Sequence, residues 1–380
     1  MTAFRTLGFH NGHILIGDAI VDAAVLTQAD GRFTAVEPHA HDTDGIDLQG
    51  GWLLPGFIDV QVNGGGGVLL NNDISADALG TIARAHARFG TTALMPTLIT
   101  DAPAAIAAAL DAVDAAIEAR VPGIVGLHIE GPFISAARKG IHDPALIRPL
   151  DPALIELLCR PRRGRVMLTL APEAVSAEAL ATLAAAGVIL CAGHTNATFE
   201  QAQAGFAAGI SGVTHLYNAM SPLLHRAPGM VGAALLNDAV YCGLIADGIH
   251  VAAPALDIAW RMKGPDRLML VTDGMPSVGM RDGSFTLNGR EITVQGGVCQ
   301  DAEGTLAGSS LNMAAALRHM AKHTGADVPA ASRMASGTPA RFLGLDAERG
   351  RIAPGLVADL VWLDAALNPV QCWIGGAPMI

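Results

Sequence analysis

The hydrophobic pattern of the chain is most regular in its middle part. Between positions 56 and 274, eight apolar runs of strand length recur, and most of them end on a polar residue. Ala/Leu-rich segments with helical spacing separate most of these runs, for example residues 75–90, 102–120 and 176–187. Uninterrupted apolar strands that alternate with helices are typical of a parallel sheet that is buried on both faces. Eight such units predict an α/β fold, a (β/α)₈ TIM-like barrel, over residues 53–345.

Both ends of the chain carry a different pattern. Residues 1–52 and 346–380 alternate short apolar stretches with Gly, Asp and Asn turns, as antiparallel strands do. We therefore expect the two termini to build one small β-sandwich domain beside the barrel. An insertion near residues 281–305 is predicted to form a β-hairpin on an Asn-Gly turn, and residues 309–325 then supply the eighth helix.

Composition narrows the class of protein. Hydrophobic residues make up 51% of the 380 residues, charged residues make up 16%, and the net charge is −11. The chain has no Lys/Arg cluster, which argues against binding to nucleic acid or to an anionic membrane but leaves room for a small anionic substrate. Five scattered cysteines form neither a disulfide framework nor a CxxC metal site. With no apolar run of signal-peptide or membrane-spanning length, we expect a soluble cytoplasmic protein.

Polar side chains with catalytic potential gather at the ends of the predicted strands. In a (β/α)₈ barrel the active site is built from the carboxyl ends of the strands and the loops that follow them. Two histidines and several carboxylates that converge on one rim form a ligand set suited to Zn²⁺ or Fe²⁺. The strand-end residues are Asp59, Gln61, Asn63, Thr97, Glu130, Glu173, His194, His215, Asp247, His250 and Asp273.

The same strand ends carry a family resemblance. The segments "GLHIEGPF", "AGHTNAT", "THLYNAM" and "LVTDG" resemble the signature segments of the N-acetylglucosamine-6-phosphate deacetylases in the amidohydrolase superfamily. "LPGFIDVQVNG", "PTLIT", "KGIH", "RAPGMVGA", "YCGLIADGIHV" and "GTLAGSSLNM" follow the same family in the same order. The resemblance extends from about residue 50 to residue 315, and "GLVADLV" fits the small β domain of the superfamily.

The resemblance implies a role for each residue of the reaction centre. Glu130, His194 and His215 are expected to bind a divalent metal ion, with zinc favoured over iron, cobalt or manganese. Asp273 is expected to act as general base toward the attacking water and then as the acid that protonates the leaving amine. His142, in "KGIHDP", is expected to polarise the amide carbonyl opposite the metal.

The resemblance also implies a substrate phosphate. Arg226 is the main candidate to bind it, because a guanidinium matches phosphate geometry. Asn218 and the backbone N–H of Ala219 are expected to join it. In the family, the histidine that corresponds to His250 reaches the phosphate in the neighbouring subunit, which implies a homodimer with shared sites.

One departure from the wider superfamily concerns the first strand. Many metal-dependent hydrolases carry a His-x-His pair here, whereas this chain has Gln61 and Asn63, and neutral amides are poor ligands for these ions. Some members of the family share this Gln-x-Asn, so we expect one metal ion per subunit, with Gln61 and Asn63 lying beside it as wall groups.

The expected reaction is the hydrolysis of N-acetyl-D-glucosamine 6-phosphate to D-glucosamine 6-phosphate and acetate, in amino-sugar catabolism and cell-wall recycling. Two alternatives remain open at this point. One is a related amidohydrolase that acts on N-acetylgalactosamine 6-phosphate, or on another N-acyl or cyclic amide, because the barrel is reused for many reactions. The other is a catalytically silent barrel with a binding role, against which the joint presence of Glu130, His194, His215 and Asp273 argues.

Overall fold

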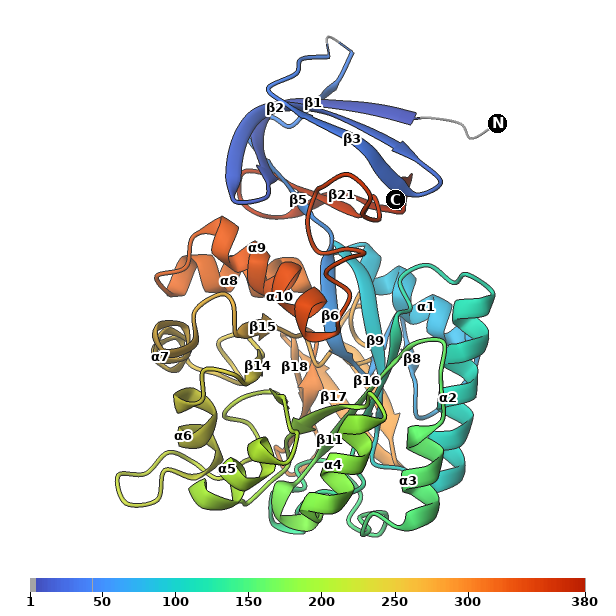
Figure 1. Cartoon of the computed structure of the whole chain (residues 1–380), viewed down its shortest axis with the longest axis vertical. Helices are drawn as coiled ribbons and strands as arrows, with labels where there is room; N and C mark the ends of the chain where they lie inside the picture. The colour runs from blue at the N-terminus through green and yellow to red at the C-terminus, as the bar shows by residue number, and fades with distance from the viewer. Residues whose placement is uncertain (1–4, 43, 380) are drawn as a thin grey trace.

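A computed structural model describes residues 5–42 and 44–379 of the chain (Figure 1). Its main sheet has eight parallel strands, and neighbours in the chain are neighbours in the sheet. Nearly all of their residues are buried, as expected for strands covered on both faces. In order along the sheet, the strands are β6 (Phe57–Val62), β9 (Thr91–Ile99), β10 (Gly126–Glu130), β11 (Arg165–Leu170), β12 (Ile189–Ala192), β13 (Gly212–Val213), β14 (Tyr241–Leu244) and β15 (Leu268–Leu270).

The sheet closes into a barrel just beyond β15. The backbone N–H of Asp273 donates to the carbonyl of Gln61 at 3.0 Å, and Val62 pairs with Gly274 in a parallel bridge. These contacts join the last strand region to the first strand, which confirms the predicted α/β barrel. The peptide of Asp273 is therefore part of the seam that closes the fold.

Helices cover the outside of the barrel. Several begin with a side-chain cap, such as Ser75 before α1 and the Thr198–Gln201 capping box of α5, which satisfies N–H groups of the first turn. The segments predicted to be helical overlap α1, α2, α4 and α8. The helices are α1 (Ala76–Ala87), α2 (Pro103–Glu118), α3 (Pro152–Cys159), α4 (Ala177–Ala185), α5 (Phe199–Ala207), α6 (Gly229–Leu236), α7 (Ala253–Lys263), α8 (Met313–His323), α9 (Val328–Ala335) and α10 (Gly337–Phe342), with 3₁₀ turns η1 (Ala136–Arg138) and η2 (Pro172–Ala174).

Two apolar clusters stabilise the barrel. The larger one lies between the sheet and the surrounding helices. The smaller one fills the barrel interior, where Met167 and Met269 cluster with Phe342 of α10. Figure 1 shows α10 between the barrel strands and the terminal sheet, so this helix covers the barrel end that faces that sheet. Among the described residues, no helix is both long and apolar enough to cross a membrane.

The two ends of the chain form one separate sheet, as predicted. Strand β5 of the N-terminal part pairs antiparallel with β20 of the C-terminal part, and Figure 1 shows β1, β2 and β3 lying across β5 and β21. The rings of Phe9 and Trp373 pack edge-to-face at 5.8 Å between them. The strands are β1 (Arg5–Ile16), β2 (Ala19–Ala29), β3 (Arg32–Pro38), β4 (Ile46–Asp47), β5 (Trp52–Pro55), β20 (Leu360–Leu363), β21 (Pro369–Ile374) and β22 (Ala377–Pro378).

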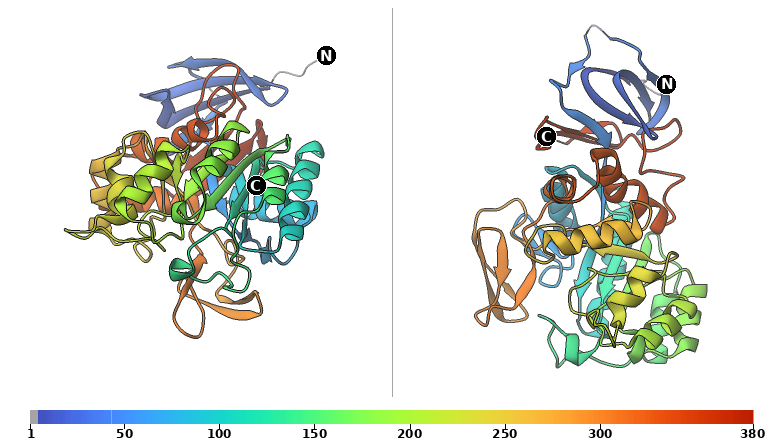
Figure 2. Two further views of the ribbon diagram at one scale, coloured as in Figure 1. Left: turned by 60° about the horizontal axis from the view of Figure 1, so that its bottom comes forward. Right: turned by 90° about the vertical axis from the view of Figure 1, so that its left-hand side faces the viewer.

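The insertion after β15 is larger than the predicted hairpin. Asn288 and Gly289 both have positive φ, as a type I′ turn requires, but four antiparallel strands form instead of two. Apolar residues of this insertion sheet cluster with Ile99, Ile141 and Met275 of the barrel loops. Figure 2 shows the insertion in orange on one side of the barrel. Its strands are β16 (Gly283–Leu287), β17 (Arg290–Gln295), β18 (Val298–Gln300) and β19 (Leu306–Ser309), and the short pair β7 (Gly64–Gly65) and β8 (Val68–Leu69) precedes α1.

Candidate active site and metal centre

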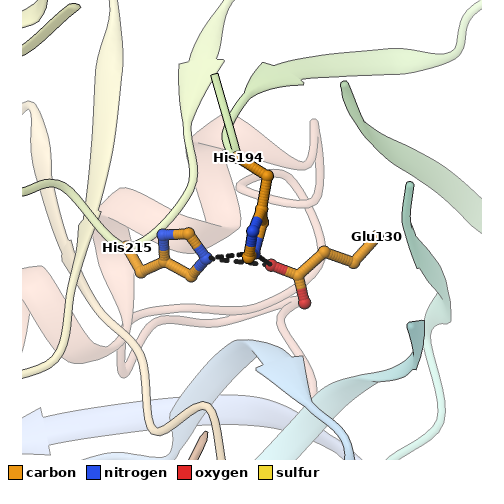
Figure 3. A group of neighbouring side chains, drawn as sticks. All are labelled: Glu130, His194 and His215. Atoms are coloured by element: carbon orange, nitrogen blue, oxygen red, sulfur yellow. Dashed lines mark hydrogen bonds and ion pairs between the residues drawn. The ribbon is translucent and has the colours of Figure 1, made fainter. Parts of the chain in front are cut away.

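Three side chains from different strand ends converge on one point (Figure 3). Glu130 ends β10, His194 follows β12 and His215 follows β13. Glu130 Oε1 lies 3.2 Å from His194 Nε2 and 3.0 Å from His215 Nε2, and the two Nε2 atoms are 3.1 Å apart. All three residues are at least 94% buried. The structure therefore brings together the three residues that the sequence analysis expected to bind a metal ion.

The backbone at these positions is unusual. His194, His215 and Asp273 all have positive φ, of 46°, 33° and 52°, which non-glycine residues rarely adopt. Such conformations cost free energy and occur where the surrounding structure enforces them, often at functional sites. Each of the three residues follows directly on a barrel strand region, so the left-handed residue marks the turn at which the chain leaves the strand.

Hydrogen bonds from neighbouring loops orient His194. Its Nδ1 atom lies 2.9 Å from the backbone oxygen of Arg138, which leaves Nε2 pointing at Glu130. Glu173 accepts hydrogen bonds from the Thr195 hydroxyl at 2.5 Å and from the Asn196 N–H at 2.6 Å. Glu173 thus holds the loop that carries His194, and it does not line the cavity in which Glu130, His194 and His215 lie.

The three residues fit a divalent metal ion. One ligand atom from each can be chosen so that all lie within 4.8 Å of one another, and the set combines one carboxylate oxygen with two imidazole nitrogens. Burial by itself would raise the pKa of Glu130, but the hydrogen bonds from His194 and His215 outweigh it and hold that pKa well below its ordinary value. A charged carboxylate beside two imidazoles is a donor set that suits zinc and its first-row neighbours.

Asp273 lies beside this cluster and contacts both amides of the first strand. Asn63 Nδ2 donates to Asp273 Oδ1 at 2.6 Å, and Gln61 Nε2 donates to the same atom at 3.1 Å. Gln61 Nε2 also lies 3.3 Å from Glu130 Oε1. Burial, and next the charge of Glu130, raise the pKa of Asp273 above its ordinary value. A carboxylate with a raised pKa is suited to exchange protons near neutral pH.

His142 approaches the cluster from the loop after β10. Its ring centroid is 4.2 Å from that of His194, and its Nδ1 atom lies 2.7 Å from the hydroxyl of Thr100. Burial, and next the nearby His194, keep the pKa of His142 well below its ordinary value, so the ring is neutral. The Thr100 hydroxyl also donates to the Glu130 carbonyl at 3.3 Å, so two neutral tautomers of His142 fit this contact; in the one whose Nδ1 accepts from Thr100, Nε2 carries the proton and can donate it.

A cavity of about 400 Å³ opens over these groups. Asn218, Ala219 and His250 line it, and His250 Nδ1 is bonded to Asp247 Oδ2 at 2.6 Å. His250 thus lines the cavity of its own subunit, and its expected contact with the neighbouring subunit's substrate stays a prediction. Arg226 does not line the cavity of this chain. Its side chain is exposed, in the loop that runs from Ser221 to Met230.

Five of the strand-end residues do not line the cavity, and these are Asp59, Gln61, Thr97, Glu173 and Asp247. Asp59 is buried and accepts a hydrogen bond from the Thr272 hydroxyl at 2.5 Å, and burial raises its pKa to about 7. The Thr97 hydroxyl binds the N–H of Val62 at 2.9 Å, inside the barrel wall. Asp59 lies three positions and Thr97 two positions before the end of its strand, where a polar side chain can face the barrel interior or a neighbouring strand and not the cavity beyond the strand ends.

Among the residues near the site that the sequence argument did not identify, three are informative, and two of these, Arg138 and Leu306, line the cavity. Thr100 follows β9 immediately and contacts His142, so a search one residue beyond each apolar run would have found it. Arg138 lies eight residues beyond β10 and lines the cavity. Leu306 belongs to the insertion sheet and lines the cavity; it lies in the family-like segment "GTLAGSSLNM", but the sequence argument assigned it no role.

The fold and this site define a metal-dependent hydrolase of the barrel type, and the chain belongs to the amidohydrolase family, whose model matches residues 52–378. It is 42% identical over 363 residues to the N-acetylgalactosamine-6-phosphate deacetylase of Shewanella sp. (strain ANA-3), covering 96% of this chain and 90% of that protein. It is 36% identical over 349 residues to the N-acetylglucosamine-6-phosphate deacetylase of Haemophilus influenzae, covering 90% and 91%. Among solved structures, a mutant N-acetyl-D-glucosamine-6-phosphate deacetylase from Mycobacterium smegmatis, in complex with N-acetyl-D-glucosamine-6-phosphate, superposes with a TM-score of 0.90, 32% identity and complete coverage of both chains.

Proposed function

We propose that this protein hydrolyses the acetamide of N-acetyl-D-glucosamine 6-phosphate and releases D-glucosamine 6-phosphate and acetate. One observation carries the proposal: the cluster of Glu130, His194 and His215 shares a single cavity with Asp273 and His142. That set supplies a metal site, a proton-transfer group and a carbonyl donor, which are the groups that amide hydrolysis needs. The family membership and the complex of the Mycobacterium smegmatis relative support it.

Glu130, His194 and His215 would hold the divalent ion, which we expect to be zinc, with iron, cobalt or manganese as alternatives. When bound, such an ion supplies Lewis acidity, which lowers the pKa of water and polarises a carbonyl oxygen. The bond between His194 Nδ1 and the Arg138 carbonyl supports this role, because ligand histidines are oriented by a partner on their other nitrogen.

Asp273 would carry the proton. Its carboxylate takes a proton from the attacking water and returns it to the amine that leaves, so the aspartate ends the cycle in its starting state. The raised pKa of Asp273 favours both transfers, because a group that exchanges protons works best with a pKa near the operating pH. His142 would donate from Nε2 to the carbonyl oxygen of the acetamide as negative charge develops there.

One ion per subunit is expected. Gln61 and Asn63 direct amide N–H groups at Glu130 and Asp273, the carboxylates that a second cation would otherwise contact. Neutral donors there satisfy the carboxylates without adding charge. Two amides are poor substitutes for a His-x-His pair, so they would serve as wall groups of a one-metal site.

The substrate phosphate would bind at the cavity mouth, against Asn218, the N–H of Ala219 and His250. Arg226 is proposed to join them from a neighbouring subunit or after its loop moves, because in this chain it lies outside the cavity wall. Leu223 and Leu224 of the same loop are 53% and 55% exposed, which favours a homodimer that covers them. A phosphorylated sugar substrate favours a cytoplasmic location.

The galacto epimer is a second candidate substrate. The relative from Shewanella, at 42% identity, is named for N-acetylgalactosamine 6-phosphate, and a relative from Escherichia coli O157:H7 with the same name is 38% identical. The two sugars differ at a single hydroxyl, so the metal cluster, Asp273 and His142 serve either one equally.

The deciding experiment measures acetate release by metal-stripped protein from both N-acetylhexosamine 6-phosphates. Zn²⁺, Fe²⁺ and Co²⁺ are added back separately, and bound metal is counted per subunit. We expect activity to return with close to one ion per subunit and to be greater on the gluco epimer. Greater kcat/KM on the galacto epimer would select the second candidate, and no acetate from either sugar would refute the proposal.

A further inference from the structure

The wall of the cavity contains a single strong cation among the residues that the structure describes. Its carboxylates are Glu130 and Asp273, and its only arginine or lysine is Arg138. Besides the divalent ion that Glu130, His194 and His215 would hold, a phosphate dianion in the cavity of this chain therefore finds one permanent positive charge on the wall. Phosphate recognition in proteins commonly uses a guanidinium, whose planar donors match two phosphate oxygens.

The side chain of Arg138 is held along one edge. Its Nε donates to Asn196 Oδ1 at 3.0 Å. Within the part of the chain that the structure describes, neither Nη1 nor Nη2 of this arginine has a protein acceptor at hydrogen-bond distance. One nitrogen thus orients the guanidinium, while the terminal nitrogens keep their donors for a ligand. Pre-orientation of this kind lowers the entropy lost on binding.

The backbone of Arg138 is tied to the reaction centre. Its carbonyl binds His194 Nδ1 at 2.9 Å, and the N–H of Ser135, at the start of the same turn, donates to the His194 carbonyl at 2.8 Å. His142 lies on the same loop, and its N–H donates to the carbonyl of Lys139 at 3.0 Å. Arg138 and His142 are thus held at set positions relative to one metal ligand.

From these contacts we propose that Arg138 is a substrate-binding residue that contacts the 6-phosphate from within the same subunit. The inference rests on the proposed function, which supplies the phosphorylated substrate. The competing explanation is purely structural: the side chain of Arg138 contributes only its bond to Asn196, which ties two loops together as a clasp. The two explanations differ in whether the effect of removing the guanidinium depends on the phosphate.

The test compares Arg138→Ala with wild type on N-acetylglucosamine with and without the 6-phosphate. We expect kcat/KM on the phosphorylated sugar to fall about 10- to 100-fold, mainly through KM, as for the loss of a charge-assisted hydrogen bond. On the unphosphorylated sugar the change should stay within about twofold, and bound metal should be unchanged. Equal losses on both sugars, or loss of metal, would show a structural role and overturn the proposal.

Two variants serve as controls. Lys139→Ala removes the adjacent cation, whose Nζ contacts the Gly140 carbonyl at 3.2 Å and which does not line the cavity; it should retain both activities. Asn196→Ala removes the clasp but keeps the guanidinium, so it should lose less on the phosphorylated sugar than Arg138→Ala does. An Asn196→Ala variant that reproduces the full Arg138→Ala loss would again point to the clasp.

A binding measurement separates this inference from the proposed function. Calorimetric titration of the metal-loaded protein with D-glucosamine 6-phosphate needs no turnover. If wild type binds this amine but hydrolyses neither N-acetylhexosamine 6-phosphate, the proposed function fails, while weaker binding by Arg138→Ala still supports the role of Arg138. Equal affinity in the two proteins, or no binding by wild type, overturns that role.

Discussion

The side-chain amide of Asn63 donates a hydrogen bond of 2.6 Å to Oδ1 of Asp273, across the seam that closes the barrel. The bond satisfies the proposed proton-transfer group with a neutral donor from the first strand. It also places an N–H group where the second histidine of a His-x-His pair would offer a ring nitrogen. The following predictions start from this arrangement.

Restoring the histidine pair tests the one-metal proposal. In the double variant Gln61→His/Asn63→His, imidazoles replace both amides beside Glu130 and Asp273. We expect bound zinc to rise from about one toward two ions per subunit, because imidazole nitrogens are good zinc ligands and amides are not. Elemental analysis after dialysis measures this, with Gln61→Ala/Asn63→Ala as the control that should stay at one ion. A wild type that already holds two tight ions would contradict the proposal.

Removing the charge of Asp273 tests its role in proton transfer. Asp273→Asn keeps the shape of the side chain but cannot accept the proton from water. We expect kcat to fall at least about 100-fold, the low end for loss of a general acid–base group, with metal content unchanged. Steady-state kinetics measure the fall in kcat, and metal analysis of the same sample shows whether the metal content is unchanged. Near-normal turnover would remove Asp273 from the mechanism.

Replacing Thr100 tests whether its hydroxyl sets the tautomer of His142. If that hydroxyl donates to Nδ1, it keeps the neutral ring protonated on Nε2, the nitrogen proposed to face the carbonyl oxygen. Thr100→Val removes this bond at nearly equal volume, and we expect kcat to fall about tenfold or more with little change in KM. Thr100→Ser retains the hydroxyl and should recover most of the loss. A Val variant with wild-type kcat would show that the hydroxyl does not set the tautomer.

Replacing Arg226 tests whether this residue contacts the substrate phosphate and whether a second subunit supplies it. We expect Arg226→Ala to raise KM for the phosphorylated sugar by about tenfold or more and to leave the unphosphorylated sugar nearly unaffected. If a neighbouring subunit supplies the residue, mixing Arg226→Ala with Asp273→Asn protein and allowing subunits to exchange should restore part of the activity. Equal losses on both sugars would instead argue that Arg226 only stabilises its loop.

The burial of His86 as a neutral side chain predicts that the protein loses stability in acid. It is fully buried in α1, with Nε2 at 2.9 Å from the Gly64 carbonyl, and burial lowers its pKa to about 4. The unfolded chain takes up this proton near pH 6.5 but the folded chain does so only near pH 4, so the contribution is full above pH 6.5 and is lost as the pH falls toward 4. Between those limits it amounts to about 3 kcal/mol.

His86→Gln can keep a donor toward Gly64 while removing the titration. Thermal unfolding of the two proteins at pH 7.5, 6 and 5 should show the Tm of wild type falling more steeply than that of the variant. Parallel curves would mean that His86 titrates alike in both states.

The hydrophobic periodicity of the sequence predicted the barrel strands and the position of the site at their ends. Eight apolar runs, most of which end on a polar residue, predicted a parallel barrel, and the strand ends of that barrel bring Glu130, His194 and His215 together. The size of the insertion was missed because β18 and β19 are only three and four residues long, too short for alternation to stand out.

Contacts between loops could not be predicted from the periodicity of the sequence. Arg138 and Arg226 look alike as loop arginines, yet Arg138 lines the cavity and Arg226 does not. What separates them is the hydrogen bonding of their loops, since the turn that carries Arg138 is bonded to His194. Such bonds join residues 56 positions apart, and no local pattern specifies them.

The closing seam of the barrel has a consequence for the order of folding. Because the peptide of Asp273 bonds to Gln61 on one side and to Ser309 on the other, the last strand region cannot dock on the first without also placing this aspartate. Recovery of activity during refolding therefore cannot precede the joining of segments more than 200 residues apart. The return of enzyme turnover would therefore report when this long-range contact has formed, whereas far-ultraviolet circular dichroism follows the formation of helices, which rests on local contacts.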